Sequence, residues 1–171
     1  MAGAYTLETL LAREEITDVI KRLARGTDRL DAELIVSCYH DDGYDDHNAF
    51  RGGASEFAQW VCAVLPHFAA TMHFVGPPLI RLDGDTAHTD TYCVAHHVSK
   101  SDAEGTQTDM VLGLRYVDRF ERRNGSWLIA KRVCAFDWTT TVAVDAATRY
   151  QFEDGWTVGA RDRSDITYRG V

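Results

Sequence analysis

Two tight turns divide the second half of the chain into long runs of strand-like sequence. One turn is centred on Gly84 and the other on Asn124 and Gly125. Asp-Gly and Asn-Gly pairs between apolar runs are strong signals of a β-hairpin, because these residues readily adopt the left-handed conformations that tight turns require. The turns predict a meander of antiparallel strands, at residues 79–82, 86–99, 109–122 and 126–138.

The first half of the chain has helical periodicity instead. Apolar residues recur at spacings of three and four over residues 6–25, which is typical of an amphipathic helix. We expect Gly26 to end this helix, because glycine adopts the left-handed conformation at little cost. A short helix over residues 31–39 follows, and Ser55 can cap a third helix that runs to about Pro66.

The segment between the second and third helices is mixed in pattern. We expect a turn at residues 40–43, a first strand at residues 44–50 and a second turn at residues 51–53. Helices followed by a meander of long strands predict an α+β fold, in which a curved antiparallel sheet wraps around the helices. Such a sheet leaves a conical interior, which is a natural pocket.

A chain of 171 residues fits a single domain, with a core at about residues 7–140 and a tail at residues 141–171. The tail is polar and carries Phe152, Trp156 and Tyr168 as scattered aromatic anchors. We expect it to pack on the outside of the domain or on a neighbouring molecule.

Charge and cysteine usage exclude several classes of function. A formal net charge of -8 argues against a nucleic-acid ligand, because Lys and Arg must neutralise the phosphates. The four cysteines lack zinc-ligand or redox spacing, which predicts buried reduced thiols. The N-terminus has no signal-peptide pattern and no run could span a bilayer, so we expect a cytoplasmic protein without a membrane partner.

His73 is the centre of the candidate site. It lies in a strand-like segment that Gly76 interrupts, and a buried imidazole needs partners for both ring nitrogens. Asp28, just behind the first helix, offers a carboxylate. We predict that Asp28 and His73 meet inside the cavity and form a general base, since the carboxylate fixes the tautomer and stabilises the imidazolium. A satisfied core histidine and a surface aspartate are the structural alternative.

Other polar residues are candidates for substrate binding. His97 shares a strand face with the small residues two, four and six positions before it, and could donate to or protonate a substrate oxygen. By the same alternation His47 and Asp45 share one face of the first strand. We add Tyr44, from that strand, and Asp137, near the expected mouth of the cavity.

The last two strands carry further polar residues. Tyr116 or Arg115 could polarise a carbonyl, but we favour cross-strand ion pairs on the outer face, such as Asp118 with Arg132. The acidic residues 40–47 match no specific ligand template, so we predict no metal. A nucleophile motif, a phosphate loop and a dinucleotide fingerprint are all missing from the sequence, which indicates acid-base chemistry without a cofactor.

With this layout, the chain resembles the SnoaL-like branch of the nuclear transport factor 2 superfamily, which includes scytalone dehydratase, bile-acid 7α-dehydratase and hexachlorocyclohexane dehydrochlorinase. Residues 27–28, 71–74 and 116–127 carry the resemblance. It implies the cone-shaped fold and places Asp28 and His73 at the family's catalytic aspartate and histidine. It also aligns His47 with a tyrosine of the two dehydratases, and His97 with a second histidine of scytalone dehydratase.

The resemblance implies a cofactor-independent lyase that performs a dehydratase-type elimination on a small, largely apolar cyclic or aromatic substrate. His73 would remove the proton, and His97 or His47 would bind or protonate the oxygen. The same pair would suit an isomerase, a polyketide cyclase or a retro-aldol lyase. The resemblance also implies a homo-oligomer, either a dimer or a trimer.

Two alternative functions do not use proton abstraction by His73. A reaction like that of limonene epoxide hydrolase would need an Asp-Arg-Asp set in the cavity. A non-catalytic role, like that of the small subunit of ring-hydroxylating dioxygenases, would be indicated by a cone that side chains fill.

Overall fold

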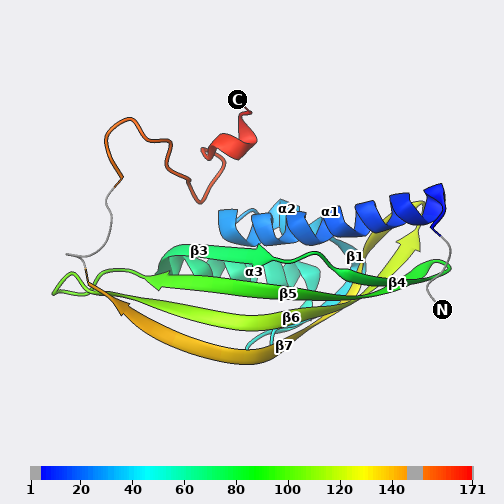
Figure 1. The fold of residues 1–171 in the computed structure, drawn as a ribbon, viewed down its shortest axis with the longest axis horizontal. Helices are drawn as coiled ribbons and strands as arrows, with labels where there is room; N and C mark the ends of the chain where they lie inside the picture. The colour runs from blue at the N-terminus through cyan, green and yellow to red at the C-terminus, as the bar shows by residue number, and fades with distance from the viewer. Residues whose placement is uncertain (1–4, 146–151, 171) are drawn as a thin grey trace.

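The computed structural model describes residues 5–145 and 152–170, in which helices pack on a long, curved sheet (Figure 1). The helical elements are α1 (Leu7–Arg29), α2 (Ala32–Val36), α3 (Ala54–Val64), η1 (Leu65–His67) and η2 (Ile166–Tyr168). The strands are β1 (Tyr39–Asp46), β2 (Arg51–Gly53), β3 (Phe68–Val75), β4 (Leu79–Asp83), β5 (Thr86–Ser99), β6 (Gln107–Arg123) and β7 (Ser126–Val144).

The sheet confirms the expected α+β architecture. Its strand order is β2-β1-β7-β6-β5-β3, and β4 pairs with β5 outside this path. Neighbouring strands are antiparallel, except that β1 runs parallel to β7. The sheet is curved and unclosed, and α1 and α3 lie along one side of it (Figure 1).

The predicted hairpins are present. β4 and β5 join at Gly84 (φ 58°), and β6 and β7 join at Asn124 (φ 54°) and Gly125 (φ 85°). Asn124 and Gly125 both have the positive φ that a type I′ turn requires, whereas in the other turn Gly84 supplies positive φ at the first central position. β6 and β7 extend beyond the predicted strands, to residues 107–123 and 126–144.

Helix α1 continues further than predicted. A capping box between Thr6 and Thr9 starts it, and it ends at Leu30, whose φ is 55°. Gly26 lies inside the helix, so the prediction that it ends the helix is wrong. A Cβ at Gly26 would lie 3.1 Å from Cγ1 of Ile35, so the glycine allows α2 to pack closely. Asp28 consequently lies in the last turn of α1, where the helix fixes its direction.

The segment around β1 also differs from the prediction. The expected turn at residues 40–43 is part of β1, which accommodates it through an irregular register between Tyr39 and Tyr44. The strand ends at Asp46, and residues 51–53 form β2 rather than a turn. Gly53 is the N-cap of α3, and no side chain of the described residues caps it, so Ser55 does not serve as the cap.

The C-terminal segment packs on the outside of the helices, beside the end of α1 (Figure 1). The hydroxyl of Tyr168 donates to Asp31 at 2.8 Å, and Arg25 lies 4.5 Å above the Tyr168 ring. Phe152 and Trp156 contact each other and stay 63% and 50% exposed, so of the three expected anchors only Tyr168 is one. In the described ranges, no helix combines the length and apolarity needed to cross a bilayer.

Candidate active site

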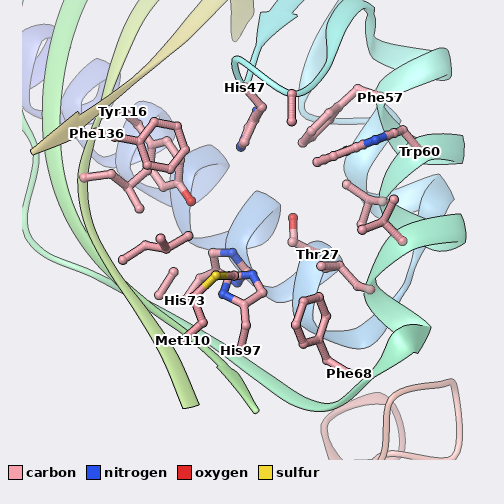
Figure 2. Close-up of a pocket in the computed structure, with 17 residues that line it drawn as sticks. Thr27, His47, Phe57, Trp60, Phe68, His73, His97, Met110, Tyr116 and Phe136 are labelled. Carbon is pink, nitrogen blue, oxygen red and sulfur yellow. The ribbon is translucent and has the colours of Figure 1, made fainter. Parts of the chain in front are cut away.

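An open cavity of about 230 Å³ lies between α3, the end of α1 and the concave side of the sheet. Six of the described residues that line it carry polar groups: Thr27, His47, Trp60, His73, His97 and Tyr116. Figure 2 shows these side chains projecting inward from different walls. The remaining lining residues are apolar: Ala49, Phe57, Val61, Val64, Leu65, Phe68, Ala95, Met110, Leu112, Leu114 and Phe136.

The predicted contact between Asp28 and His73 is present. Oδ1 of Asp28 lies 2.8 Å from Nδ1 of His73, and the two side chains are only 13% and 9% exposed. Asp28 also accepts from the backbone N–H of His73 and from the hydroxyl of Thr71, each at 2.9 Å. Because a carboxylate can only accept, Nδ1 carries the hydrogen, and Nε2 of the neutral ring keeps a free lone pair.

The hydrogen bonds keep Asp28 ionised. Burial acts to raise the pKa of this carboxyl, but the hydrogen bonds and charge of His73 and the hydrogen bond from Thr71 outweigh burial, so the pKa lies below its ordinary value. An ionised carboxylate stabilises the imidazolium that forms when His73 takes up a proton. The geometry therefore suits a general base.

Arg161, from the C-terminal segment, supports this pair through hydrogen bonds on the side away from the cavity. Its guanidinium donates to the carbonyls of Leu65 (3.1 Å) and Phe68 (3.0 Å) and to the Thr71 hydroxyl at 3.2 Å. Thr71 in turn donates to Asp28, so a chain of hydrogen bonds links Arg161 to His73. No sequence pattern pointed to Arg161, because it lies in a segment that is distant along the chain and has no periodicity.

His97 lies beside His73 in the cavity. The rings meet edge to face with centroids 5.4 Å apart, and Phe68 covers His97 from another side at 5.1 Å. Nδ1 of His97 is buried without a hydrogen-bond partner among the described residues. Burial, together with the charge of His73, lowers the pKa of His97 to about 4. His97 is therefore neutral at pH 7, so one of its ring nitrogens can donate a hydrogen bond and the other can accept one, but it carries no imidazolium proton to transfer.

His47 and Asp45 form a second carboxylate–imidazole pair. Nδ1 of His47 bonds to Oδ1 of Asp45, and the hydroxyl of Tyr39 donates to Oδ2. Asp45 is fully buried and lies behind His47, so it does not itself line the cavity. The His47 ring stacks on Phe57 with centroids 4.7 Å apart and faces His73 across the cavity (Figure 2).

A buried ion pair lies below the cavity floor. Arg132 donates to both carboxylate oxygens of Asp118, at 2.8 and 2.7 Å, and the side chains are 3% and 0% exposed. The predicted pairing is thus present, but its expected position on the outer face is wrong. The Tyr116 ring covers Arg132 at 4.0 Å. Asp45, Arg132 and Asp118 form an Asp-Arg-Asp row across the sheet that does not reach the cavity, so it cannot activate water there.

Two sequence-based candidates lie outside the cavity. Tyr44 is next to the inward-facing Asp45 and so points outward, where Lys131 packs on its ring at 5.9 Å. Asp137 is an extra residue in β7, where Leu114 pairs with Phe136 and Gly113 with Trp138. This bulge turns Asp137 to the outer face, where it forms a bidentate pair with Arg115.

The sequence matches the model of the SnoaL-like domain over residues 8–133, and the chain therefore belongs to the SnoaL-like domain family. It is 29% identical over 124 residues to the uncharacterized protein Rv2910c of Mycobacterium tuberculosis, covering 71% of this chain and 82% of that protein.

Solved structures share the fold. A hexachlorocyclohexane dehydrochlorinase of type 2 is 18% identical, with a TM-score of 0.71 and coverage of 88% of this chain and 99% of that one. A proposed scytalone dehydratase of Novosphingobium aromaticivorans is 17% identical, with a TM-score of 0.68 and coverage of 84% and 97%. Proteins named as enzymes are thus among the structures with this fold.

Proposed function

We propose that this protein is a cofactor-independent lyase that performs a dehydratase-type elimination on a small, neutral cyclic or aromatic compound. The observation that carries the proposal is the pairing of Asp28 with Nδ1 of His73 at the wall of an open, mostly apolar cavity. This arrangement directs the remaining nitrogen of a base towards bound substrate. His73 takes a proton from carbon next to a carbonyl, and Asp28 stabilises the imidazolium that results.

The cavity supports the proposed substrate class. Lys, Arg, Asp and Glu are missing from its described lining, so a charged substrate would lose its hydration without gaining a counter-charge. Its volume of about 230 Å³ lies below the roughly 300–1,000 Å³ of sites for drug-sized ligands, which favours a compound of one or two rings. His97 and His47 are both placed to meet an oxygen of such a compound.

The open cavity also separates the alternatives. A non-catalytic subunit has no need of a carboxylate-backed imidazole at a vacant apolar pocket, so the site favours an enzyme. The same proton abstraction would begin an isomerase, cyclase or retro-aldol reaction. Elimination is our choice because hexachlorocyclohexane dehydrochlorinase and the proposed scytalone dehydratase share the fold.

We also propose that the protein is a homo-oligomer. Met72, Phe74 and Tyr92 form an apolar strip on the outer face of the sheet, with exposed fractions of 62%, 70% and 68%. Contiguous apolar patches of this kind typically mark interfaces. Light scattering coupled to size exclusion should give a mass above that of one chain, and a monomer at all concentrations would refute this proposal.

The proposed activity can be tested with a β-hydroxy cyclohexanone, a neutral ring compound that yields cyclohexenone and water on elimination. We expect the unaltered protein to release cyclohexenone, and His73→Gln to lower the rate by about 10²–10⁴-fold. His96→Gln is the matched control, because His96 pairs with Asp109 at 2.7 Å on the outer face of the same sheet. Full activity of His73→Gln would contradict the proposal.

A further inference from the structure

The cavity holds two carboxylate–imidazole pairs on opposite walls, and the charges behind them differ. We propose that His47, backed by Asp45, is the proton donor of the site, and that the leaving group is therefore a hydroxyl, which needs a proton in order to depart. This inference rests on the proposed function and deepens it, because it divides the two halves of the elimination between His73 and His47.

The carboxylate behind His73 has a guanidinium nearby. Asp28 is ionised, and the Arg161 guanidinium lies one hydroxyl away, bonded to the Thr71 side chain that donates to Asp28. Asp28 and Arg161 attract each other across this bridge. One carboxylate on this wall thus has one guanidinium near it.

The charge behind His47 is not balanced in this way. Asp45 and Asp118 are both buried, and Arg132 is the only buried Lys or Arg of the described residues. Both oxygens of Asp118 bind that guanidinium, so Asp45 is left with a neutral phenol and His47. Two buried carboxylates thus share one guanidinium, and the negative charge left over is strongly unfavourable in the interior. A proton on His47 supplies the missing positive charge.

The other groups that face His47 favour the same state. From α3, the rings of Phe57 and Trp60 lie at centroid distances of 4.7 and 6.3 Å. Aromatic faces attract a cation, and neither ring carries a charge. From β6, the Tyr116 ring lies at 6.1 Å; burial raises the pKa of its phenol well above the ordinary value, so Tyr116 stays neutral. His97 cannot take the role of donor, because its pKa is about 4.

Nε2 of His73 takes a proton from the carbon next to the carbonyl, and the electrons of that C–H bond form the new double bond. The C–O bond to the neighbouring carbon breaks, and the departing hydroxyl takes the proton of His47 and leaves as water. After product release, solvent returns the proton from His73 to His47. The substrate class is a neutral ring ketone with a β-hydroxyl group.

A change of leaving group tests the inference. The β-hydroxy cyclohexanone and its acetate ester both give cyclohexenone, but acetate departs without needing a proton. We expect His47→Gln to slow the loss of water by about 10²–10⁴-fold and the loss of acetate by less than about tenfold. Asp45→Asn should show the same selectivity, and retained acetate elimination shows that the altered cavity is intact.

The outcomes separate the two proposals. If His47→Gln eliminates water as fast as the unaltered protein, or loses both activities equally, the assignment of His47 as proton donor is overturned. Loss of both activities in His73→Gln, with the selective loss in His47→Gln, supports the division of tasks. If the unaltered protein eliminates neither group, the proposed function fails, and this inference fails with it.

Discussion

Asp28→Asn is the change that most sharply tests the geometry of the base. Asp28 accepts three hydrogen bonds, from the Thr71 hydroxyl, the His73 backbone N–H and Nδ1 of His73, at 2.9, 2.9 and 2.8 Å. An amide has only one accepting oxygen. If that oxygen faces Thr71 and the ring, its NH₂ group meets the backbone N–H of His73. If the amide turns the other way, its NH₂ group faces the ring, and Nδ1 of His73 must accept from it. The ring hydrogen then lies on Nε2, which needs a free lone pair to act as the base.

Either orientation impairs the base. We expect kcat/KM for elimination to fall by about 10²–10⁴-fold, which is about 3–5 kcal/mol of transition-state stabilisation at 1.36 kcal/mol per tenfold change. One buried donor without an acceptor costs about 1–3 kcal/mol of stability. For a chain of this size each kcal/mol lowers Tm by about 2–4 °C, so Tm should fall by about 2–12 °C.

The assay combines cyclohexenone release with thermal unfolding followed by circular dichroism. Asp109→Asn is the matched control, because it alters the same kind of carboxylate–imidazole pair outside the cavity. If Asp28→Asn keeps kcat/KM within threefold of the unaltered protein, the reasoning from hydrogen bonds is wrong, whatever happens to Tm.

Arg161→Met should lower the free energy of unfolding by about 1–3 kcal/mol in denaturant titration, because it removes the donors that part-buried oxygens bind. Arg163→Met is the control, because its side chain is 65% exposed, and it should lower the free energy of unfolding by less than about 1 kcal/mol. Equal effects of the two changes would contradict the role of Arg161. Folding lowers the pKa of His97 from 6.5 to about 4, so between these pH values the unfolded chain binds a proton that the folded chain does not. The free energy of unfolding should therefore fall as the pH is lowered from 7 to 4.5. His97→Gln should make this fall smaller by about 2 kcal/mol. Burial raises the pKa of Cys38 and Cys93 to about 11, whereas Cys62 is only half-buried. A thiol reagent at pH 8 should therefore label Cys62 first. Fast labelling of the buried cysteines in the native state would contradict this order.

Sequence patterns predicted the parts of the fold that depend on neighbouring residues, such as the hairpin turns. The hairpin turns at Gly84 and at Asn124–Gly125 require positive φ, which few residues adopt, so they could be found from sequence. The contact between Asp28 and His73 was predicted from the chemical needs of a buried imidazole and from the family resemblance. The structure adds the distance and the brace behind the pair.

The predictions from sequence are wrong where contacts between residues distant along the chain determine the structure. Gly26 ends no helix, because its lack of a Cβ is used for packing against Ile35. The bulge at Asp137 shifts the alternation of faces, which a sequence pattern cannot register. The pair of Asp118 and Arg132 is buried because the curved sheet turns that face inward. Arg161 reaches the site only through the return of the C-terminal segment.

The most direct test of the central claim is to measure proton abstraction alone. Cyclohexanone has acidic C–H bonds but no leaving group, so in D₂O only exchange at the carbons next to the carbonyl can occur. We expect the unaltered protein to accelerate this deuterium uptake, followed by NMR, and His73→Gln to slow it by about 10²–10⁴-fold. Equal uptake with both proteins would contradict the claim that His73, held by Asp28, is the base.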